Sequence, residues 1–371
     1  MKIREITTYI EELAPLKFQE DYDNAGLISG DPDDEVKGIL LCLDLTDEVL
    51  DEAISKNCNL IISHHPFVFK AVKNITSKTL TGRLMIKAIR NHIHIYAVHT
   101  NLDQVEQGVN QILGQKLRLM NLRILRPFTN TLYKLVVYCP NMRDKDDIPV
   151  PEKVRNALFK AGAGQIGNYD SCSYNTEGYG TFRGLQGSQP FIGEQGKMES
   201  QNEIRIETIF PAHLKSKVVE AMLAVHPYEE VAYDIYKLEN EYPKAGAGMT
   251  GTLEYPLNGL DFLYHVKSDL GLQMLRHNQI PLHNIHKVAF CGGSGAFLIP
   301  DAIQQGCDAF VSADLKYHEF LDTNGELLLV DIGHYEGEQF TIELLYDYLI
   351  KKYDTFAVSK TMVKTNPINY F

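Results

Sequence analysis

The residues CNLIISHHPF, at positions 58–67, begin as an apolar run and end in two adjacent histidines followed by a proline. A run of this length and composition predicts a strand that is buried on both faces. Because a proline ring restrains the residue before it to extended backbone, His65 is expected to hold a defined conformation directly after that strand. Parallel α/β sheets bind their ligands at the carboxyl ends of their strands, so His64 and His65 are candidate functional residues.

Apolar runs and amphipathic segments alternate on both sides of this stretch. The spacing of isoleucine and leucine predicts an amphipathic helix over 3–14, and 36–43 is another unbroken apolar run. Helical spacing follows at 45–55, and 93–98 is a third apolar run. Strand, helix and strand in this order predict βαβ units with a parallel sheet. Residues 1–127 are therefore expected to form the first half of an α/β domain.

The pattern changes in the middle of the chain. The expected order there is strand, helix, strand, strand, helix and strand, at 133–140, 152–160, 170–182, 204–211, 214–225 and 231–238. This βαββαβ order is that of ferredoxin-like domains. Residues 128–247 are therefore predicted to form an inserted ferredoxin-like α+β domain.

The segment 248–371 resumes the first pattern. Small residues in PKAGAGMTGTLE lead to further apolar runs at 287–291, 309–312 and 327–330, with a helical segment after the first. The predicted fold class is α/β: a discontinuous α/β domain with a parallel-rich sheet, built from the two outer segments and interrupted by the ferredoxin-like insert.

Composition and charge restrict the class of protein. The 371 residues exceed the roughly 250 to 300 at which single cores stop growing, so at least two domains are expected. No apolar run approaches the roughly 18 residues of a membrane span, and the N-terminus lacks the features of a signal peptide. The net charge of -12 opposes binding to nucleic acid. The six scattered cysteines, without a CxxC pair, are expected to be buried free thiols of a cytoplasmic protein.

Two more expected strand ends carry imidazole or carboxylate groups. HTNLD follows the third apolar run and contributes His99 and Asp103. DIGHYEGEQF follows a later run and opens a helix, so His334 and Glu338, four positions apart, share one helix face. Three expected strand ends therefore deliver side chains of the kind that bind metals.

Histidine and carboxylate groups are the ligands of Zn²⁺, Fe²⁺, Mn²⁺ and Co²⁺, and the lack of a thiolate cluster argues against a structural cysteine site. A lone histidine at a strand end is more often merely hydrogen-bonded, but the conjunction at three ends of one expected sheet favours a metal site. These candidates exceed the needs of one tetrahedral catalytic ion, so two ions roughly 3.5–4 Å apart, bridged by a carboxylate, fit better. The predicted ligands are His64, His65, Asp103, His334 and Glu338.

Other polar positions allow two interpretations each. ADLKYHEFLD places Asp314 and His318 after an apolar run; they fit either a helix cap with an exposed histidine or a pair that lines the cleft, and the second is favoured. CGGSGAF, at 291–297, fits either a phosphate-cradling loop or a tight strand-to-helix turn. The histidines interpreted as structural, capping or solvated are His92, His94, His265, His277, His283 and His286.

These segments together resemble the family of GTP cyclohydrolase 1 type 2 homologs, also called Nif3-like proteins. The matching stretches are DYDNAGLISGD, LDLTDEVLDEAISKNCNLIISHHPFVF, YAVHTNLD, FCGGSGAFLIPDAIQQGCDAFVSADLKYHEFLD and DIGHYEGE. The resemblance implies a dinuclear centre on the five predicted ligands, with His99 close by as an additional ligand or supporting group. Two divalent ions per chain are expected, zinc being favoured and iron or manganese the alternatives.

The segment that ends in HPYEEVAYDIY, at 226–236, resembles the PII/CutA-like insert of the longer bacterial members of this family. The resemblance also implies a ring-shaped homohexamer whose metal sites face an internal cavity. In such a ring the inserts would cap or gate that cavity.

The leading hypothesis is a metal-dependent hydrolase that uses a metal-bound water on an unidentified small-molecule substrate, GTP cyclohydrolase chemistry being implied by the resemblance. The predicted catalytic residues are His99, Asp314 and His318, which would orient the substrate or move protons, and Asp23 with Asn24 would line the entrance. The rival hypothesis is a non-catalytic ring that stores, delivers or senses metal, with an insert that binds a ligand or partner. A third is a structural oligomer with a vestigial site.

Overall fold

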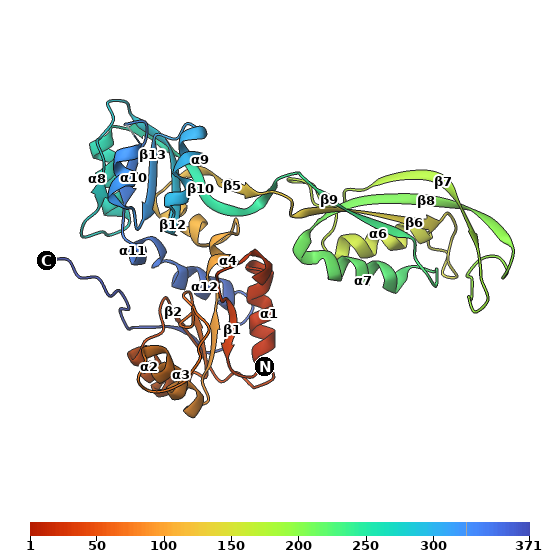
Figure 1. Ribbon diagram of the computed structural model, residues 1–371, viewed down its shortest axis with the longest axis horizontal. Helices are drawn as coiled ribbons and strands as arrows, with labels where there is room; N and C mark the ends of the chain where they lie inside the picture. Colours follow the sequence, from red (N-terminus) through yellow and green to blue (C-terminus); the bar gives the residue numbers. More distant parts are fainter. Residues whose placement is uncertain (324) are drawn as a thin grey trace. The chain divides into compact units, whose positions relative to one another are not determined.

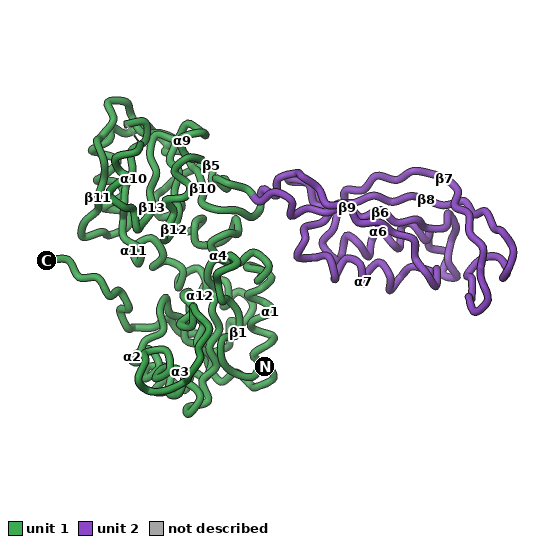
Figure 2. Tube along the Cα trace, in the orientation of Figure 1, with its two compact units in different colours: residues 1–127, 244–371 green, residues 128–243 purple. Residues whose placement is uncertain are grey.

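The chain divides into two compact units in the computed structural model, which describes residues 1–323 and 325–371. Unit 1 comprises Met1–Pro127 and Lys244–Phe371, and unit 2 comprises Phe128–Pro243 (Figure 2). Unit 1 is thus discontinuous in the sequence, and unit 2 interrupts it.

Unit 1 contains a five-stranded sheet, called sheet I, with the strand order β1-β4-β3-β2-β15. The last four are parallel to one another, and β1 is antiparallel to β4 at the edge. Its strands are β1 (Gly26–Ser29), β2 (Ile39–Cys42), β3 (Leu60–Ser63), β4 (His94–Ala97) and β15 (Val358–Lys360). The accompanying helices are α1 (Ile3–Leu13), α2 (Asp47–Ser55), α3 (Leu80–Arg90) and α12 (Thr341–Ile350).

Local sequence explains why these elements form. Every residue of β2, β3 and β4 is buried, as expected for parallel strands that are covered on both faces. Helices α2 and α3 begin after threonines whose hydroxyl oxygens accept a backbone N–H, Thr46 from Val49 and Thr79 from Gly82. The apolar faces of both helices join the strands in one hydrophobic core. The predicted elements of this half are therefore confirmed.

A second sheet of unit 1, called sheet II, has six strands in the order β11-β14-β13-β12-β10-β5. Figure 1 labels β5, β10, β12 and β13 among them. Within sheet II β12, β13 and β14 are parallel, whereas β10 and β11 run antiparallel to their neighbours. Its strands are β5 (Met120–Phe128), β10 (Tyr242–Leu257), β11 (Arg276–His277), β12 (Ile285–Ser294), β13 (Ala309–Ala313) and β14 (Leu328–Asp331). The helices between them are α8 (Gly259–Asp269), α9 (Ile299–Gln304) and α10 (Tyr317–Asp322).

The expectation that the three functional strand ends belong to one sheet is wrong. β3 and β4 are neighbours in sheet I, whereas β14 lies in sheet II, which has a separate core around Phe290, Val311 and Val330. Periodicity identifies a strand but not its partner, because pairing is decided by contacts between segments distant in the sequence. Short helices follow the strand ends: α4 (Thr100–Asp103) after β4 and α11 (His334–Glu338) after β14, with α5 (Val109–Lys116) beyond α4.

Unit 2 has the element order β6, α6, β7, β8, α7 and β9, with an antiparallel sheet ordered β7-β8-β6-β9. One face of this sheet packs on the two helices through residues such as Val137 and Ile206. The bounds are β6 (Leu132–Pro140), α6 (Val150–Lys160), β7 (Tyr174–Arg183), β8 (Met198–Pro211), α7 (Lys215–Val225) and β9 (Tyr233–Leu238).

Two further observations concern the state of the cysteines and the search for membrane-spanning helices. All six cysteines are free, and five are buried while Cys172 is partly exposed. Among the helices of the described residues, none combines the length and apolar character needed to cross a membrane.

Candidate metal centre

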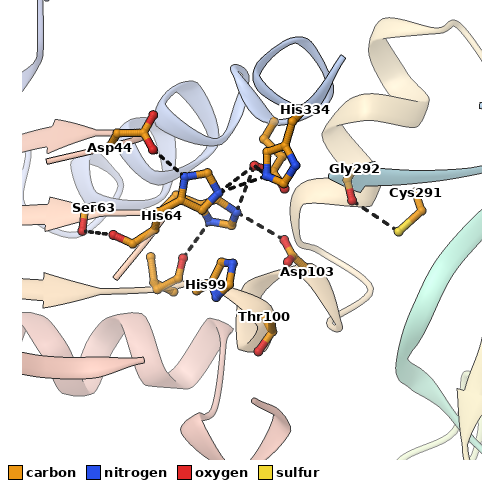
Figure 3. Close-up of polar contacts among 12 residues, drawn as sticks. Asp44, Ser63, His64, His99, Thr100, Asp103, Cys291, Gly292 and His334 are labelled. Carbon is orange, nitrogen blue, oxygen red and sulfur yellow. Dashed lines mark hydrogen bonds and ion pairs between the residues drawn. The ribbon is translucent and has the colours of Figure 1, made fainter. Parts of the chain in front are cut away.

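Five side chains from the ends of three strands converge in unit 1. His64 and His65 directly follow β3, and Asp103 ends α4, which follows β4. His334 and Glu338 lie at the two ends of the five-residue helix α11. Figure 3 shows His64, Asp103 and His334 turned toward one another. The structure therefore brings together all five residues predicted as ligands.

The Glu338 carboxylate lies at the middle of this cluster. Its Oε2 atom is 3.0 Å from His65 Nε2, 3.2 Å from His334 Nε2 and 3.8 Å from His64 Nε2. His64 Nε2 is also 3.6 Å from Asp103 Oδ1. Two groups of three side chains are each compact enough to hold a metal ion, one with His64 and Asp103 and one with His65 and His334, and Glu338 belongs to both.

Three atoms at the centre of the cluster are buried without a hydrogen bond to any described residue. They are His64 Nε2, Asp103 Oδ1 and Glu338 Oε2. A buried polar atom without a partner costs about 1–3 kcal/mol, and more when it is charged. Three such atoms facing one another are therefore unfavourable unless protons or a metal cation compensate them, and imidazole nitrogen with carboxylate oxygen is the donor set that divalent transition metals accept. The residues present fit a metal ion.

The Nδ1 atoms of His64, His65 and His334 are held in place by hydrogen bonds. Three Nδ1 atoms pair with oxygen atoms: His64 with Val98 O at 2.8 Å, His65 with Asp44 Oδ1 at 2.7 Å, and His334 with Asp314 Oδ2 at 2.7 Å. With Nδ1 donating, Nε2 presents its lone pair to the centre of the cluster, which is the usual arrangement of metal-bound histidines.

His99 lies at the edge of the cluster. Its ring centroid is 5.3 Å from those of His64 and His65, and it joins them in a third group of side chains compact enough for a metal. Its Nδ1 is 2.8 Å from Asp23 Oδ1. Although burial acts to raise the pKa of Asp23, hydrogen bonds from His99 and Thr100 lower it to about 2. Asp23 is thus a fixed negative partner for the His99 ring.

Electrostatic effects within the cluster are strong. Burial, together with the charge of Glu338, raises the pKa of Asp103 well above its usual value. Burial acts to raise the pKa of Glu338 as well, but the three surrounding histidines hold it well below its usual value. Burial acts to lower the pKa of His65, yet Asp44 and Glu338 raise it to about 10, and Glu338 raises that of His334 to about 9. Without metal, protons on these rings compensate the buried carboxylate.

The glycine-rich stretch CGGSGAF packs against this centre. Gly293 has a φ of +63°, and a Cβ atom there would lie only 2.1 Å from Glu338 Oε1. The N–H of Gly292 is already used, since it donates to Asn110 Oδ1 at 2.9 Å. Of the two interpretations of this stretch, the structure favours the tight turn over a phosphate-cradling loop.

The remaining predicted residues are placed apart from the cluster. Asp314, in the left-handed region with a φ of 56°, contacts the metal-binding groups only through His334. His318 is exposed, packs edge-on against Tyr317, and belongs to none of the metal-capable groups among the described residues. Asn24 donates to Val68 O at 2.8 Å. None of the histidines interpreted as structural joins a metal-capable group within the described part of the chain.

Two supporting residues were not predicted. Asp44, which holds His65, lies two positions after β2 and follows the same strand-end rule that identified the ligands. Thr365 donates to Asp44 Oδ2 at 3.0 Å, and the next residue, Asn366, donates to Glu336 Oε1 at 3.0 Å. No pattern in the sequence around Thr365 indicates this contact.

A cavity of about 560 Å³ opens beside the cluster. His65, His99, Asp103, His334 and Glu338 form its polar wall. Its other lining residues include the aromatic side chains of Tyr22, Phe67, Phe69 and Phe297. A cavity of this size with a few convergent polar groups is typical of a small-molecule site.

Comparison with known proteins identifies relatives over the full chain. The family model Duf34/NIF3 (NGG1p interacting factor 3) matches residues 1–367. A Bacillus subtilis protein named GTP cyclohydrolase 1 type 2 homolog is 39% identical over 334 residues, or 90% of this chain and 88% of the relative. A Halalkalibacterium halodurans protein of the same name is 38% identical over the whole of both chains.

Solved structures agree with these matches. A Bacillus cereus protein described as related to NIF3 is 36% identical, with a TM-score of 0.87 over 100% of this chain and 99% of that one. A Staphylococcus aureus protein is 31% identical, with a TM-score of 0.77 over 100% of this chain and 99% of that one. The resemblance identified from the sequence is therefore confirmed, and the chain belongs to the Duf34/NIF3 family.

Proposed function

We propose that the chain is a dinuclear-metal-binding protein and that it acts as a metal-dependent hydrolase. The observation that carries this proposal is the convergence of three buried, unpartnered atoms from His64, Asp103 and Glu338. The proposed ligands are His64, His65, Asp103, His334 and Glu338. Because both metal-capable groups share Glu338, this carboxylate would belong to the ligand sets of both ions, with zinc favoured over iron or manganese.

Divalent ions at this position would supply Lewis acidity and lower the pKa of a coordinated water. The side chains around them have separate roles in the proposal. His99, held by Asp23 and facing the cavity, is placed to move a proton. Asp44 and Asp314 position His65 and His334, so Asp314 supports a ligand rather than acting on substrate.

The substrate belongs to the same proposal. The aromatic lining of the cavity supports a small molecule with a flat apolar part. The named relatives are GTP cyclohydrolase 1 type 2 homologs, which makes GTP the first compound to test, followed by cyclic phosphoesters and amides.

A second candidate function is a non-catalytic protein that stores, delivers or senses metal. The side chain of His334 is 41% exposed, which favours exchange of a bound ion with solvent. The βαββαβ order of unit 2 and its strand order support a PII/CutA-like, ferredoxin-like insert that binds a ligand or partner. For either function we propose that the chain forms a homohexameric ring. We also propose a cytoplasmic location, which the free cysteines support.

Elemental analysis of the purified protein tests the metal site. About two equivalents of metal per chain are expected, because two groups of ligands share one carboxylate. His334→Ala and Glu338→Gln should lower this content, whereas His318→Ala, at an exposed histidine on helix α10, should not. Full metal content in the Glu338→Gln protein would overturn the ligand assignment.

Turnover separates the two candidate functions. A hydrolase should convert GTP, or another compound in the series, in a reaction that a chelator abolishes and added metal restores. A carrier should instead exchange bound metal readily and show no such reaction. Chelator-sensitive turnover that persists at full rate in the Glu338→Gln protein would contradict a role for this centre.

A further inference from the structure

Unit 2 contains a cavity of about 570 Å³ that is separate from the metal centre. Val137 and Ile206 face the helices of the unit, so the neighbouring side chains of Tyr138 and Arg205 face the opposite side of the sheet. Both of these line the cavity. The cavity therefore lies on the open face of the sheet, and its volume is within the roughly 300–1,000 Å³ of small-molecule sites.

Two glycines of β7 open the floor of this cavity. Gly178 pairs with Glu203 across the β7 and β8 strands, and a Cβ atom at Gly178 would meet nothing within 4 Å. At Gly180 the carboxylate of Glu203 takes the place of a side chain, since Glu203 Oε2 lies 2.3 Å from the ideal Cβ position. Larger residues here would fill the cavity or displace Glu203.

Aromatic rings form the walls. The ring centroid of Tyr228 lies 6.5 Å from that of Phe182 and 6.3 Å from that of Phe191. The Tyr228 hydroxyl donates to Glu203 Oε1 at 2.9 Å. Burial, together with Glu203, raises the pKa of Tyr228, so this hydroxyl keeps its proton and remains a donor to the Glu203 side chain.

The charges of the lining are predominantly negative. Its carboxylates are Glu177, Glu203, Glu229 and Glu230, and its guanidinium groups are Arg183 and Arg205. Arg205 is engaged by Glu207, which lies outside the lining, at 2.9 Å. A carboxylate at the floor of an aromatic enclosure favours a cation, because ring faces and carboxylate both attract positive charge.

We infer that this cavity is a binding site for an organic ammonium ion with an apolar or aromatic body. The ammonium group contacts Glu203 at the floor, and the body lies between Phe182, Phe191 and Tyr228. This site is independent of the metal centre and of the hydrolase proposal, because all of its residues belong to unit 2.

Isothermal titration calorimetry of the full chain with three probes of similar shape tests the inference. Phenethylamine carries a positive charge, 2-phenylethanol is neutral and 3-phenylpropionate is negative. Phenethylamine should bind with one site per chain, about tenfold or more tighter than the other two, as expected for a partly desolvated cation among aromatic rings. No binding of phenethylamine, or equal binding of all three probes, would overturn the inference.

Two variants and one control locate the site. Glu203→Gln keeps the size of the side chain and should weaken phenethylamine binding about tenfold. Gly178→Leu should fill the open floor and abolish binding. Glu220→Gln, at an exposed glutamate on α7 beside the opposite sheet face, should leave binding unchanged. Binding that survives in both Glu203→Gln and Gly178→Leu would place the probe elsewhere and refute the assignment.

Discussion

Gly293→Ala, compared with a matched control, tests the proposed role of Glu338 as a metal ligand separately from the stability of the fold. The Gly293 backbone has a φ of +63°, and an added Cβ would lie 2.1 Å from Glu338 Oε1. Real Cβ atoms essentially never approach closer than 3.0 Å, so the carboxylate must move by about 1 Å. Glu338 is only 3% exposed and is surrounded by three histidines, so the shift displaces it from the shared position in the cluster.

The expected magnitudes follow from two separate costs. A left-handed backbone costs an alanine about 1–2 kcal/mol, which lowers the free energy of unfolding. Displacing a group that sets ligand geometry typically weakens metal binding about 10- to 100-fold. Gly306→Ala provides a matched control, because Gly306 has a φ of +66° but an added Cβ would meet nothing within 4 Å. The control therefore carries the backbone cost alone.

Two assays measure these costs independently. Guanidinium denaturation in excess chelator reports the free energy of unfolding, which both variants should lower, Gly293→Ala by at least as much as Gly306→Ala because it also displaces a buried carboxylate. Competition for Zn²⁺ against a chromophoric chelator reports metal affinity, which should fall only in Gly293→Ala. Equal zinc affinity in Gly293→Ala and Gly306→Ala would refute the placement of Glu338 at the centre of the metal site.

Three further predictions concern the same centre. Thr365→Val removes the hydroxyl that donates to Asp44, the residue that holds His65. The variant should therefore bind Zn²⁺ about tenfold more weakly in the same competition assay, and an unchanged affinity would contradict this prediction. Despite burial, nearby carboxylates raise the pKa of His65 to about 10 and that of His334 to about 9, so metal binding at pH 7 should release protons and weaken as the pH falls. Calorimetry in buffers of different ionisation enthalpy measures that release, and a heat independent of buffer would exclude it. Asp103→Asn removes a buried like charge and should lower metal content while preserving the free energy of unfolding in chelator; a large loss of that free energy would show that the carboxylate stabilises the fold.

The strand ends were predictable because local physics determines them. An apolar run closed by His64, His65 and Pro66 identifies a buried strand and its functional end without knowledge of the rest of the fold. Helical spacing alone places His334 and Glu338 on one face of α11. Asp44 also follows the end of a strand, but it stands alone between two leucines. Without a second histidine or carboxylate beside it, the sequence does not mark it as a functional residue.

Other features depend on contacts that no local pattern records. Thr365 reaches Asp44 only because β15 pairs with β2 and the N–H of Thr361 donates to Leu41 O. His318 follows a strand end just as the ligands do, yet α10 leaves it exposed. A strand-end position is therefore not sufficient for joining this site, because the helix that follows can leave the side chain exposed.

Placing the ligands in two sheets has a consequence for the proposed metals. Sheet I, which supplies His64, His65 and Asp103, and sheet II, which precedes His334 and Glu338, have separate hydrophobic cores. The Glu338 carboxylate is buried beside His334 and beside His64 and His65 of sheet I. Its charge raises the pKa of Asp103, and its burial makes it depend on protons or metal ions for compensation. Metal ions bound there would tie the two sheets together, and their binding energy would add to the contacts that dock one sheet on the other. Because the proposed ligands come from distant parts of the sequence, ions bound there would stabilise the tertiary structure of unit 1 in addition to any role in the proposed reaction.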